Sequence, residues 1–138
     1  MKTILIAEDN AVNRELLREL LEAREYRVEE ACNGQEALDM IPALKPDLLL
    51  LDLSMPVLDG FATLKKIRET PEMASLAVVA VTAYAMRGDQ EKAMQAGFDG
   101  YLSKPIDSSL LNRELERIWN ITGAAGPENR AKAARHEP

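Results

Sequence analysis

Short apolar runs alternate strictly with amphipathic helical patterns along most of the chain, and this alternation restricts the fold more than any other feature. Connections of a dozen or more residues allow successive strands to run parallel, so helices should cover both faces of one sheet. The expected strands, rich in β-branched and aliphatic residues, are 3–8, 26–31, 47–52, 77–82 and 100–103. The expected helices are 13–24, 35–44, 60–69, 86–96 and 110–119.

The apolar content of each expected strand indicates its place in the sheet. The first, third and fourth strands are nearly continuous apolar runs, which is typical of central strands covered on both faces. The second contains Arg27, Glu29 and Glu30, so it should lie at an edge. The sequence therefore predicts an α/β fold, a doubly wound five-stranded parallel sheet in the order 2-1-3-4-5.

The helical patterns differ in how strongly they should pack. In the first helix, Leu16, Leu17, Leu20 and Leu21 are expected to form one buried stripe. The fourth, residues 86–96, has few large apolar residues and is expected to be the most loosely packed.

The length and composition indicate one domain followed by a tail. A chain of 138 residues can bury a core without disulfides, and we expect a domain over 1–119 and a flexible polar tail over 120–138. The tail holds His136, which lacks the ordered surroundings that a phosphohistidine or a metal ligand needs. The single Cys32 is expected to be a small buried residue, and it gives no indication of an oxidising compartment.

The charge and hydropathy of the chain argue against two classes of partner. The net charge is −6 and Lys and Arg do not cluster, which opposes binding to a phosphate backbone. No apolar stretch approaches the ~18 residues of a membrane span, and the first residues do not form a signal sequence. We therefore expect a cytoplasmic protein that binds neither nucleic acid nor membranes.

Polar side chains gather where the expected strands end. Glu8 and Asp9 end the first strand, Asp52 ends the third, Thr82 ends the fourth, and Lys104 follows the fifth. Ligands of open parallel sheets bind outside the carboxyl ends of the strands, where the strand order reverses. The first and third strands are neighbours in the expected order, so Asp9 and Asp52 should meet.

Clustered carboxylates need cations. Two like charges at about 4 Å repel by roughly 1 kcal/mol in water and about 4 kcal/mol at an effective dielectric constant of 20, and Lys104 supplies only one compensating charge. Mg²⁺ prefers oxygen ligands with open water positions, whereas zinc would favour Cys or His. We interpret Glu8, Asp9 and Asp52 as Mg²⁺ ligands and Asp52 as a nucleophile in phosphoryl transfer.

Four segments carry a resemblance to the response-regulator receiver domain. They are AEDN at 7–10, LLLLDLSMPVLDG at 48–60, AVTAYA at 80–85 and YLSKP at 101–105. Each is weak alone, but their order and spacing are specific, and the resemblance covers residues 2–119. It implies the flavodoxin-like form of the doubly wound fold and a phosphorylation-activated switch of two-component signalling. The subgroup resembled most is that of stand-alone phosphorelay receivers and the receivers of hybrid kinases.

The resemblance also implies a role for each residue at the strand ends. Asp52 would accept a phosphoryl group from a histidine kinase or a His phosphotransfer protein. The main-chain carbonyl of Ser54 would join the Mg²⁺ ligands. Lys104 would pair with the phosphoryl oxygens, and Thr82 would hydrogen-bond one of them. The protein would thus catalyse its own phosphorylation and dephosphorylation, without the turnover of a conventional enzyme.

Further implied features concern the output and the lifetime of the signal. Tyr101 would turn inward when Thr82 moves, changing the surface of the fourth helix, fifth strand and fifth helix, and the bond before Pro105 would be cis. Ser54 and Tyr84 would flank the path of hydrolytic water and tune the phosphoryl lifetime. About 19 residues follow the last helical pattern, so we expect the output to be a separate protein partner unless the chain is a piece of a longer protein.

Two other functions remain open from the residues. A Mg²⁺-dependent phosphatase of the haloacid-dehalogenase kind also uses an Asp nucleophile after a strand, but it needs a second Asp where this chain has Ser54. A receiver-like interaction module that is never phosphorylated would not need the full set of acids and Lys104.

Overall fold

The computed structural model of the chain describes residues 1–53, 58–83 and 89–122. The residues expected to tune the phosphoryl lifetime, Ser54 and Tyr84, lie outside the described residues, as do Pro56 and most of the expected tail. The proposed boundary after Trp119 stays a prediction, and the last helix continues to Thr122.

Strands and helices alternate as the sequence predicts. The strands are β1 Thr3–Ala7, β2 Arg27–Ala31, β3 Leu48–Asp52, β4 Ala77–Thr82 and β5 Gly100–Ser103. The helices of the described residues are α1 Ala11–Glu22, α2 Gly34–Leu44, α3 Gly60–Glu69, α4 Asp89–Ala96 and α5 Ser108–Thr122.

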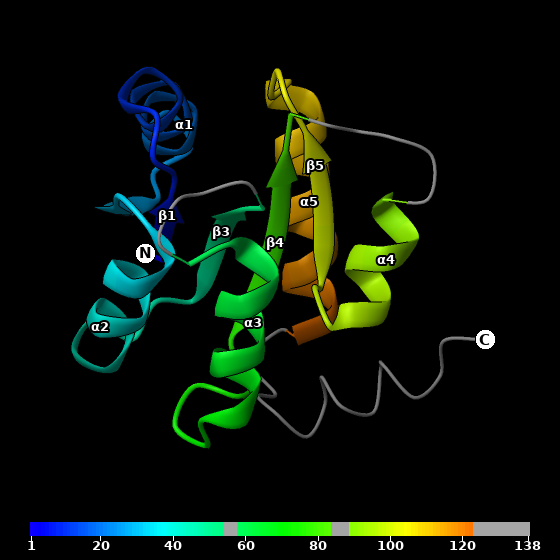
Figure 1. Cartoon of the computed structure of the whole chain (residues 1–138). Helices are drawn as coiled ribbons and strands as arrows, with labels where there is room; N and C mark the ends of the chain where they lie inside the picture. Colours follow the sequence, from blue (N-terminus) through cyan, green and yellow to red (C-terminus); the bar gives the residue numbers. More distant parts are fainter. Residues whose placement is uncertain (54–57, 84–88, 123–138) are drawn as a thin grey trace.

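The five strands form one parallel sheet in the order β2-β1-β3-β4-β5, which confirms the predicted fold class and places β2 at an edge. Figure 1 shows α3 and α4 in front of this sheet and α5 behind it. The order changes direction between β1 and β3, so the carboxyl ends of these two strands are adjacent. This is the place where the sequence predicts the site.

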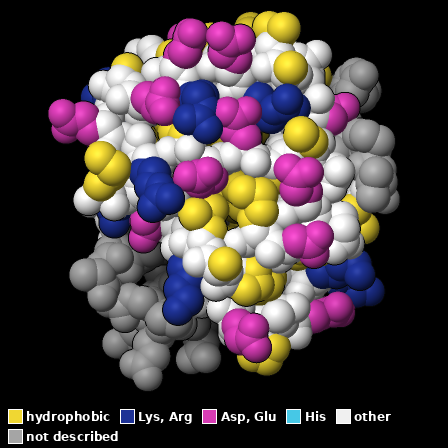
Figure 2. Space-filling view, turned by 90° about the vertical axis from the view of Figure 1, so that its left-hand side faces the viewer, with side chains coloured by type: hydrophobic (Ala, Val, Ile, Leu, Met, Phe, Trp, Pro, Cys, Tyr) yellow, Lys and Arg dark blue, Asp and Glu magenta, His cyan; other side chains and the backbone are white. Residues whose placement is uncertain are grey.

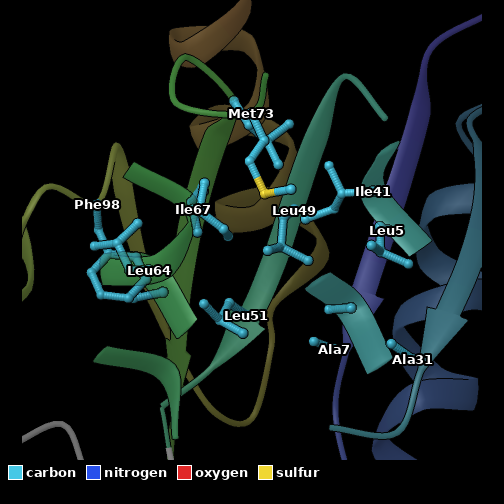
Figure 3. Close-up of a cluster of buried hydrophobic side chains, with 14 of the residues drawn as sticks. Leu5, Ala7, Ala31, Ile41, Leu49, Leu51, Leu64, Ile67, Met73 and Phe98 are labelled. Carbon is cyan, nitrogen blue, oxygen red and sulfur yellow. The ribbon is translucent and has the colours of Figure 1, made fainter. Parts of the chain in front are cut away.

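Successive residues of each strand pack alternately into two hydrophobic cores, one on each face of the sheet. Figure 3 shows the cluster between the sheet and α2, α3 and α4, with Leu5, Leu49 and Leu51 facing Ile41, Leu64 and Ile67. The opposite cluster packs α1 and α5 on the sheet through Leu17, Leu21, Leu111, Leu115 and Ile118. Helix α4 contributes only Ala93 to its cluster among the described residues, in line with its few large apolar side chains.

Two expectations about burial are wrong. Leu16 is 42% exposed, whereas Leu17 and Leu21 are buried. Successive helical residues are about 100° apart, so Leu16 lies about 100° and 140° around the helix from Leu17 and Leu21 and falls outside the buried stripe. Cys32 is exposed because β2 ends at Ala31 and the chain turns toward α2 there.

Helices α1, α2 and α3, which begin near the carboxyl ends of the strands, each have a side chain that caps the first turn. The side chains of Asn10, Asn33 and Asp59 accept hydrogen bonds from the main-chain N–H groups of Asn13, Glu36 and Ala62, respectively. Since Asn10 follows the expected site residues directly, α1 starts at the rim of the site.

The surface carries both signs of charge. Figure 2 shows Lys and Arg side chains among Asp and Glu over the described part of the face on the left of Figure 1, with small groups of hydrophobic side chains between them. The described helices include none that is both long and apolar enough to span a bilayer.

Candidate functional site

Three carboxylates meet at the carboxyl ends of β1 and β3. Asp52 is the last residue of β3, and Glu8 and Asp9 directly follow β1. One carboxylate oxygen from each of the three residues lies within 4.8 Å of the others. Parallel pairing of β1 with β3 thus brings together side chains that are far apart in the sequence.

The three acids differ in their exposure to solvent. Glu8 is 1% exposed and Asp52 is 4% exposed, whereas Asp9 is exposed. Charged carboxylates at such depth are costly unless they are paired or coordinate a cation. The arrangement is therefore open to solvent on the Asp9 side and closed beneath it.

Lys104 supplies the cationic side chain of the site. Its Nζ lies 2.5 Å from Glu8 Oε1 and 3.0 Å from Asp52 Oδ2. The Lys104 main-chain N–H donates to the carbonyl of Thr82 at 2.7 Å, which ties the end of β5 to the end of β4. The Lys104–Pro105 peptide bond is cis. Lys104 is thereby placed beside both buried acids.

The ionisation of Glu8 and Lys104 reflects this crowding. Burial, followed by the hydrogen bond with Asp52, raises the pKa of Glu8 from 4.5 to about 7. Burial lowers the pKa of Lys104, but hydrogen bonds and attraction from Glu8 and Asp52 outweigh this and raise the pKa above 10.5. Lys104 therefore stays charged at neutral pH, while the raised pKa of Glu8 brings its titration close to neutral pH.

Of the two residues expected to act as a switch, Thr82 lies at the same edge of the sheet as the acids, and Tyr101 lies within β5. Thr82, the last residue of β4, is 3% exposed. Tyr101 on β5 packs against the cluster beneath α2, α3 and α4, and its hydroxyl oxygen is buried. The Tyr101 main-chain N–H donates to Glu114 Oε2 at 3.0 Å, linking β5 to α5. Tyr101 is thus turned inward in this structure.

Two residues that the sequence analysis did not identify hold the end of β1. The Asn10 N–H donates to Glu8 Oε2 at 3.2 Å, and Arg14 Nη1 donates to the main-chain oxygen of Glu8 at 2.8 Å. The role of Asn10 as the N-cap of α1 was detectable in principle, because Asn is a typical N-cap residue, but this does not predict its main-chain contact with Glu8. The sequence carries no signal that Arg14 turns back toward Glu8.

The donor set fits a hard divalent cation. Glu8, Asp9 and Asp52 offer oxygen atoms alone, and oxygen ligands are those that Mg²⁺ prefers. Burial is the main cause of the raised pKa of Glu8, and a cation beside this carboxylate would favour its ionised form. The fourth expected ligand, the Ser54 carbonyl, lies outside the described residues.

Known proteins with the same features match nearly the whole chain. A sequence model described as response regulator receiver domain matches residues 4–116. The polar-differentiation response regulator DivK of Brucella anthropi is 40% identical over 124 residues, covering 90% of this chain and 98% of that protein.

Solved structures agree with this match. The signal receiver domain of a histidine kinase from Syntrophus aciditrophicus is 27% identical with a TM-score of 0.81, covering 90% of this chain and 94% of that one. The receiver domain of a sensor histidine kinase from Pseudomonas aeruginosa is 35% identical with a TM-score of 0.77, covering 84% of this chain and 95% of that one. The latter holds a magnesium ion coordinated in its active site cleft.

Proposed function

The chain belongs to the response regulator receiver domain family of two-component signalling, and on that premise we propose that Asp52 is its phosphoryl acceptor. Membership supports a phosphorylation-dependent signalling switch. The position of Asp52 is the observation that supports it as the acceptor. Asp52 is 4% exposed at the end of β3, and its Oδ2 lies 3.0 Å from Lys104 Nζ. The donor would be a histidine kinase or a His phosphotransfer protein.

Glu8, Asp9 and Asp52 are the residues that would hold Mg²⁺, with the Ser54 carbonyl as a further ligand. When bound there, Mg²⁺ supplies positive charge beside the oxygens of the incoming phosphoryl group. Support comes from the convergence of the three acids, whose oxygens lie within 4.8 Å of one another, and from the all-oxygen donor set. The related receiver domain with magnesium in its cleft favours the same metal here.

The transfer step uses an oxygen of Asp52 as the nucleophile. This oxygen forms a bond to phosphorus while the bond from phosphorus to the donor nitrogen breaks, and the departing imidazole keeps that electron pair. Lys104, freed from part of its pairing with Asp52, neutralises the negative charge that the phosphoryl group brings. Later attack by water on phosphorus would release inorganic phosphate and restore the Asp52 carboxylate.

The output would pass through the end of β4 to the surface of α4, β5 and α5. Thr82 would hydrogen-bond a phosphoryl oxygen, and Tyr101 would respond to the movement of Thr82. Such contacts bias an equilibrium between two pre-existing conformations rather than create a new one. We propose a downstream protein as the partner of this surface.

The test is phosphorylation by acetyl phosphate with Mg²⁺, followed by measurement of the intact mass. We expect a gain of about 80 Da, the mass of one phosphoryl group, that Asp52→Asn abolishes. Asp47→Asn is the matched control, because Asp47 lies just before β3, at the opposite end of the same strand, and accepts a hydrogen bond from Thr3. Loss of the adduct in both variants, or in neither, would contradict the assignment of Asp52.

This experiment, together with an assay of phosphoester hydrolysis, distinguishes the two other functions. An interaction module that is never phosphorylated would show no adduct in the unaltered protein at any Mg²⁺ concentration. A phosphatase would release phosphate from small phosphoesters in many turnovers.

A further inference from the structure

The peptide group that joins Glu8 to Asp9 is held from outside the site. Arg14 Nη1 donates to the Glu8 carbonyl at 2.8 Å, and the Glu8 N–H donates to the carbonyl of Ala31 at 3.1 Å. The Glu8 carbonyl and the Asp9 N–H belong to one planar unit, so fixing the carbonyl also fixes the plane from which Asp9 departs. We propose that Arg14 is a positioning residue that sets the geometry, and thereby the Mg²⁺ affinity, of the acidic site.

Arg14 can serve in this way because its own guanidinium is held. Its Nε donates to Glu30 Oε1 on β2 at 3.2 Å, and its side chain is 17% exposed. The other oxygen of Glu30 accepts from Arg18 Nε at 2.5 Å. The hydrogen bond from Arg18 is the main cause that lowers the pKa of Glu30, so Glu30 stays ionised at neutral pH.

A planar guanidinium suits this position better than any other side chain. Its donors point in fixed directions, so contact with Glu30 through Nε sets the direction in which Nη1 reaches the Glu8 carbonyl. The orientation of the Glu8–Asp9 peptide is thereby fixed relative to β2 and α1. The inference rests on the metal site of the proposed function and adds a residue that does not touch the metal.

Charge and positioning make opposite predictions for this residue. Arg14 is a cation near a cation site, so its charge alone should weaken Mg²⁺ binding, and its removal should strengthen binding. If Arg14 acts by orienting the Glu8–Asp9 peptide, its removal should weaken binding instead. The sign of the change therefore separates the two roles.

The experiment is calorimetric titration of the whole protein with MgCl₂ alone at constant ionic strength. Arg14→Met removes the donors and keeps most of the side-chain length, and we expect the dissociation constant to rise about tenfold, as for other residues that orient metal ligands. The control is Arg27→Met, which removes the same charge from β2, where Arg27 pairs with Glu29 at 3.4 Å. We expect the dissociation constant of this variant to stay within about twofold of the original.

A double variant tests whether Glu30 acts through Arg14. Glu30→Gln should weaken Mg²⁺ binding in the same direction as Arg14→Met but less. The combination should bind no more weakly than Arg14→Met alone, because both changes remove one contact. Additive effects would overturn the account of Glu30 as the support of Arg14.

Folding and geometry are measured separately from affinity. The Asp9 amide signal in nitrogen-15 NMR should shift in Arg14→Met and stay in place in Arg27→Met, since the Asp9 N–H belongs to the peptide that Arg14 holds. If Arg14→Met does not fold, Arg14→Lys keeps the charge but loses the rigid fork, and it should still weaken Mg²⁺ binding.

The outcomes separate this inference from the proposed function. Mg²⁺ binding by Arg14→Met that is as tight as, or tighter than, that of Arg27→Met overturns the positioning role and leaves the proposed function intact. Absence of Mg²⁺ binding by the unaltered protein overturns the metal site itself.

Discussion

Lys104 is the residue on which the charge balance of the site depends. Its Nζ faces two buried acids at 2.5 and 3.0 Å, and no oxygen ligand is lost when it is replaced. Lys104→Met should therefore slow phosphorylation of Asp52 by acetyl phosphate about 100-fold, the effect of removing one preorganised charge, without weakening Mg²⁺ binding.

The measurement for this variant combines the rate of mass gain with a calorimetric Mg²⁺ titration. Lys65→Met, which removes an exposed lysine of α3, is the control and should leave both quantities unchanged. A slower rate accompanied by equally weakened Mg²⁺ binding would show that Lys104 organises the metal site rather than the phosphoryl group.

The sequence predicts single residues well where their place follows from a strand end. Asp9 and Asp52 were expected to meet because neighbouring parallel strands bring their carboxyl ends to one edge, and their carboxylate oxygens lie within 4.8 Å of each other. Leu16 and Cys32 were misjudged, since helix orientation and the end of β2 depend on packing that a short pattern does not contain. Arg14 was missed for the same reason: a flexible side chain on a helix has many possible partners before the sheet is assembled.

Glu30 links β2 to α1 through Arg18 and Arg14. Arg18 lowers the pKa of Glu30 in the folded protein below the usual 4.5. A lowered pKa means that ionised Glu30 stabilises the fold above about pH 4.5, and that this contribution is lost as the pH falls through the folded-state pKa.

Urea unfolding at two pH values tests this link. The unaltered protein should exceed Glu30→Gln in free energy of unfolding at about pH 7, and this difference should shrink at about pH 3. Glu29→Gln, on the same strand, is the control for the loss of a charge. A difference that grows on acidification would show that Arg18 and Arg14 do not stabilise ionised Glu30.

Arg68 joins three elements at the end of the sheet opposite the site. From α3 it donates to the carbonyls of Leu76 at 2.6 Å and Gly97 at 2.9 Å, and it pairs with Asp99 at 3.0 Å. Asp99 also accepts a hydrogen bond from the N–H of Val78 at the start of β4. These contacts attach the turn after α4 to α3 and β4.

Replacing Arg68 should therefore weaken the fold without affecting the site. Arg68→Met leaves Asp99 and several carbonyls without this donor, and we expect a loss of about 2–3 kcal/mol in the free energy of unfolding by urea. Arg113→Met, at an exposed position of α5, is the control and should change stability little. An Mg²⁺ affinity that falls with Arg68→Met would contradict the separation between this end of the sheet and the site.

Element bounds show what pattern alone can predict. The five strands were placed within two residues at each end, since apolar runs and the breaks between them mark the strands directly. Helix α1 begins at Ala11, two residues before the expected start, because the Asn10 cap rather than the first leucine defines where it starts. Helix α5 likewise begins at Ser108, where Asp107 accepts from the N–H groups of Ser109 and Leu110.

The stability of the fold and the charge of the site are coupled. Three acids and one lysine leave a local excess of negative charge at an edge built on two buried cores. Any cation that binds the folded state alone stabilises it, by about 2.7 kcal/mol at a hundredfold excess over its dissociation constant. Mg²⁺ should therefore raise the unfolding temperature, and a chelator should return it to the metal-free value.

Asp52→Asn should weaken this dependence of stability on Mg²⁺. In the metal-free protein the change removes one of the mutually repelling acids while Lys104 keeps its contact with Glu8, so stability should rise by about 1 kcal/mol. The asparagine amide can still accept from Lys104 and can donate to Glu8, so the buried position stays hydrogen-bonded. With one oxygen ligand lost, Mg²⁺ should stabilise the variant much less than the unaltered protein.

Thermal unfolding of both proteins, with and without Mg²⁺, measures the two effects together. The variant should unfold at the higher temperature without Mg²⁺, and its advantage should shrink or disappear at saturating Mg²⁺. The same buried carboxylate would then weaken the metal-free fold and make the site reactive, as expected when function opposes stability. A variant that is less stable in both conditions would indicate instead that the Asp52–Lys104 ion pair stabilises the fold and that Asp52 is a structural residue.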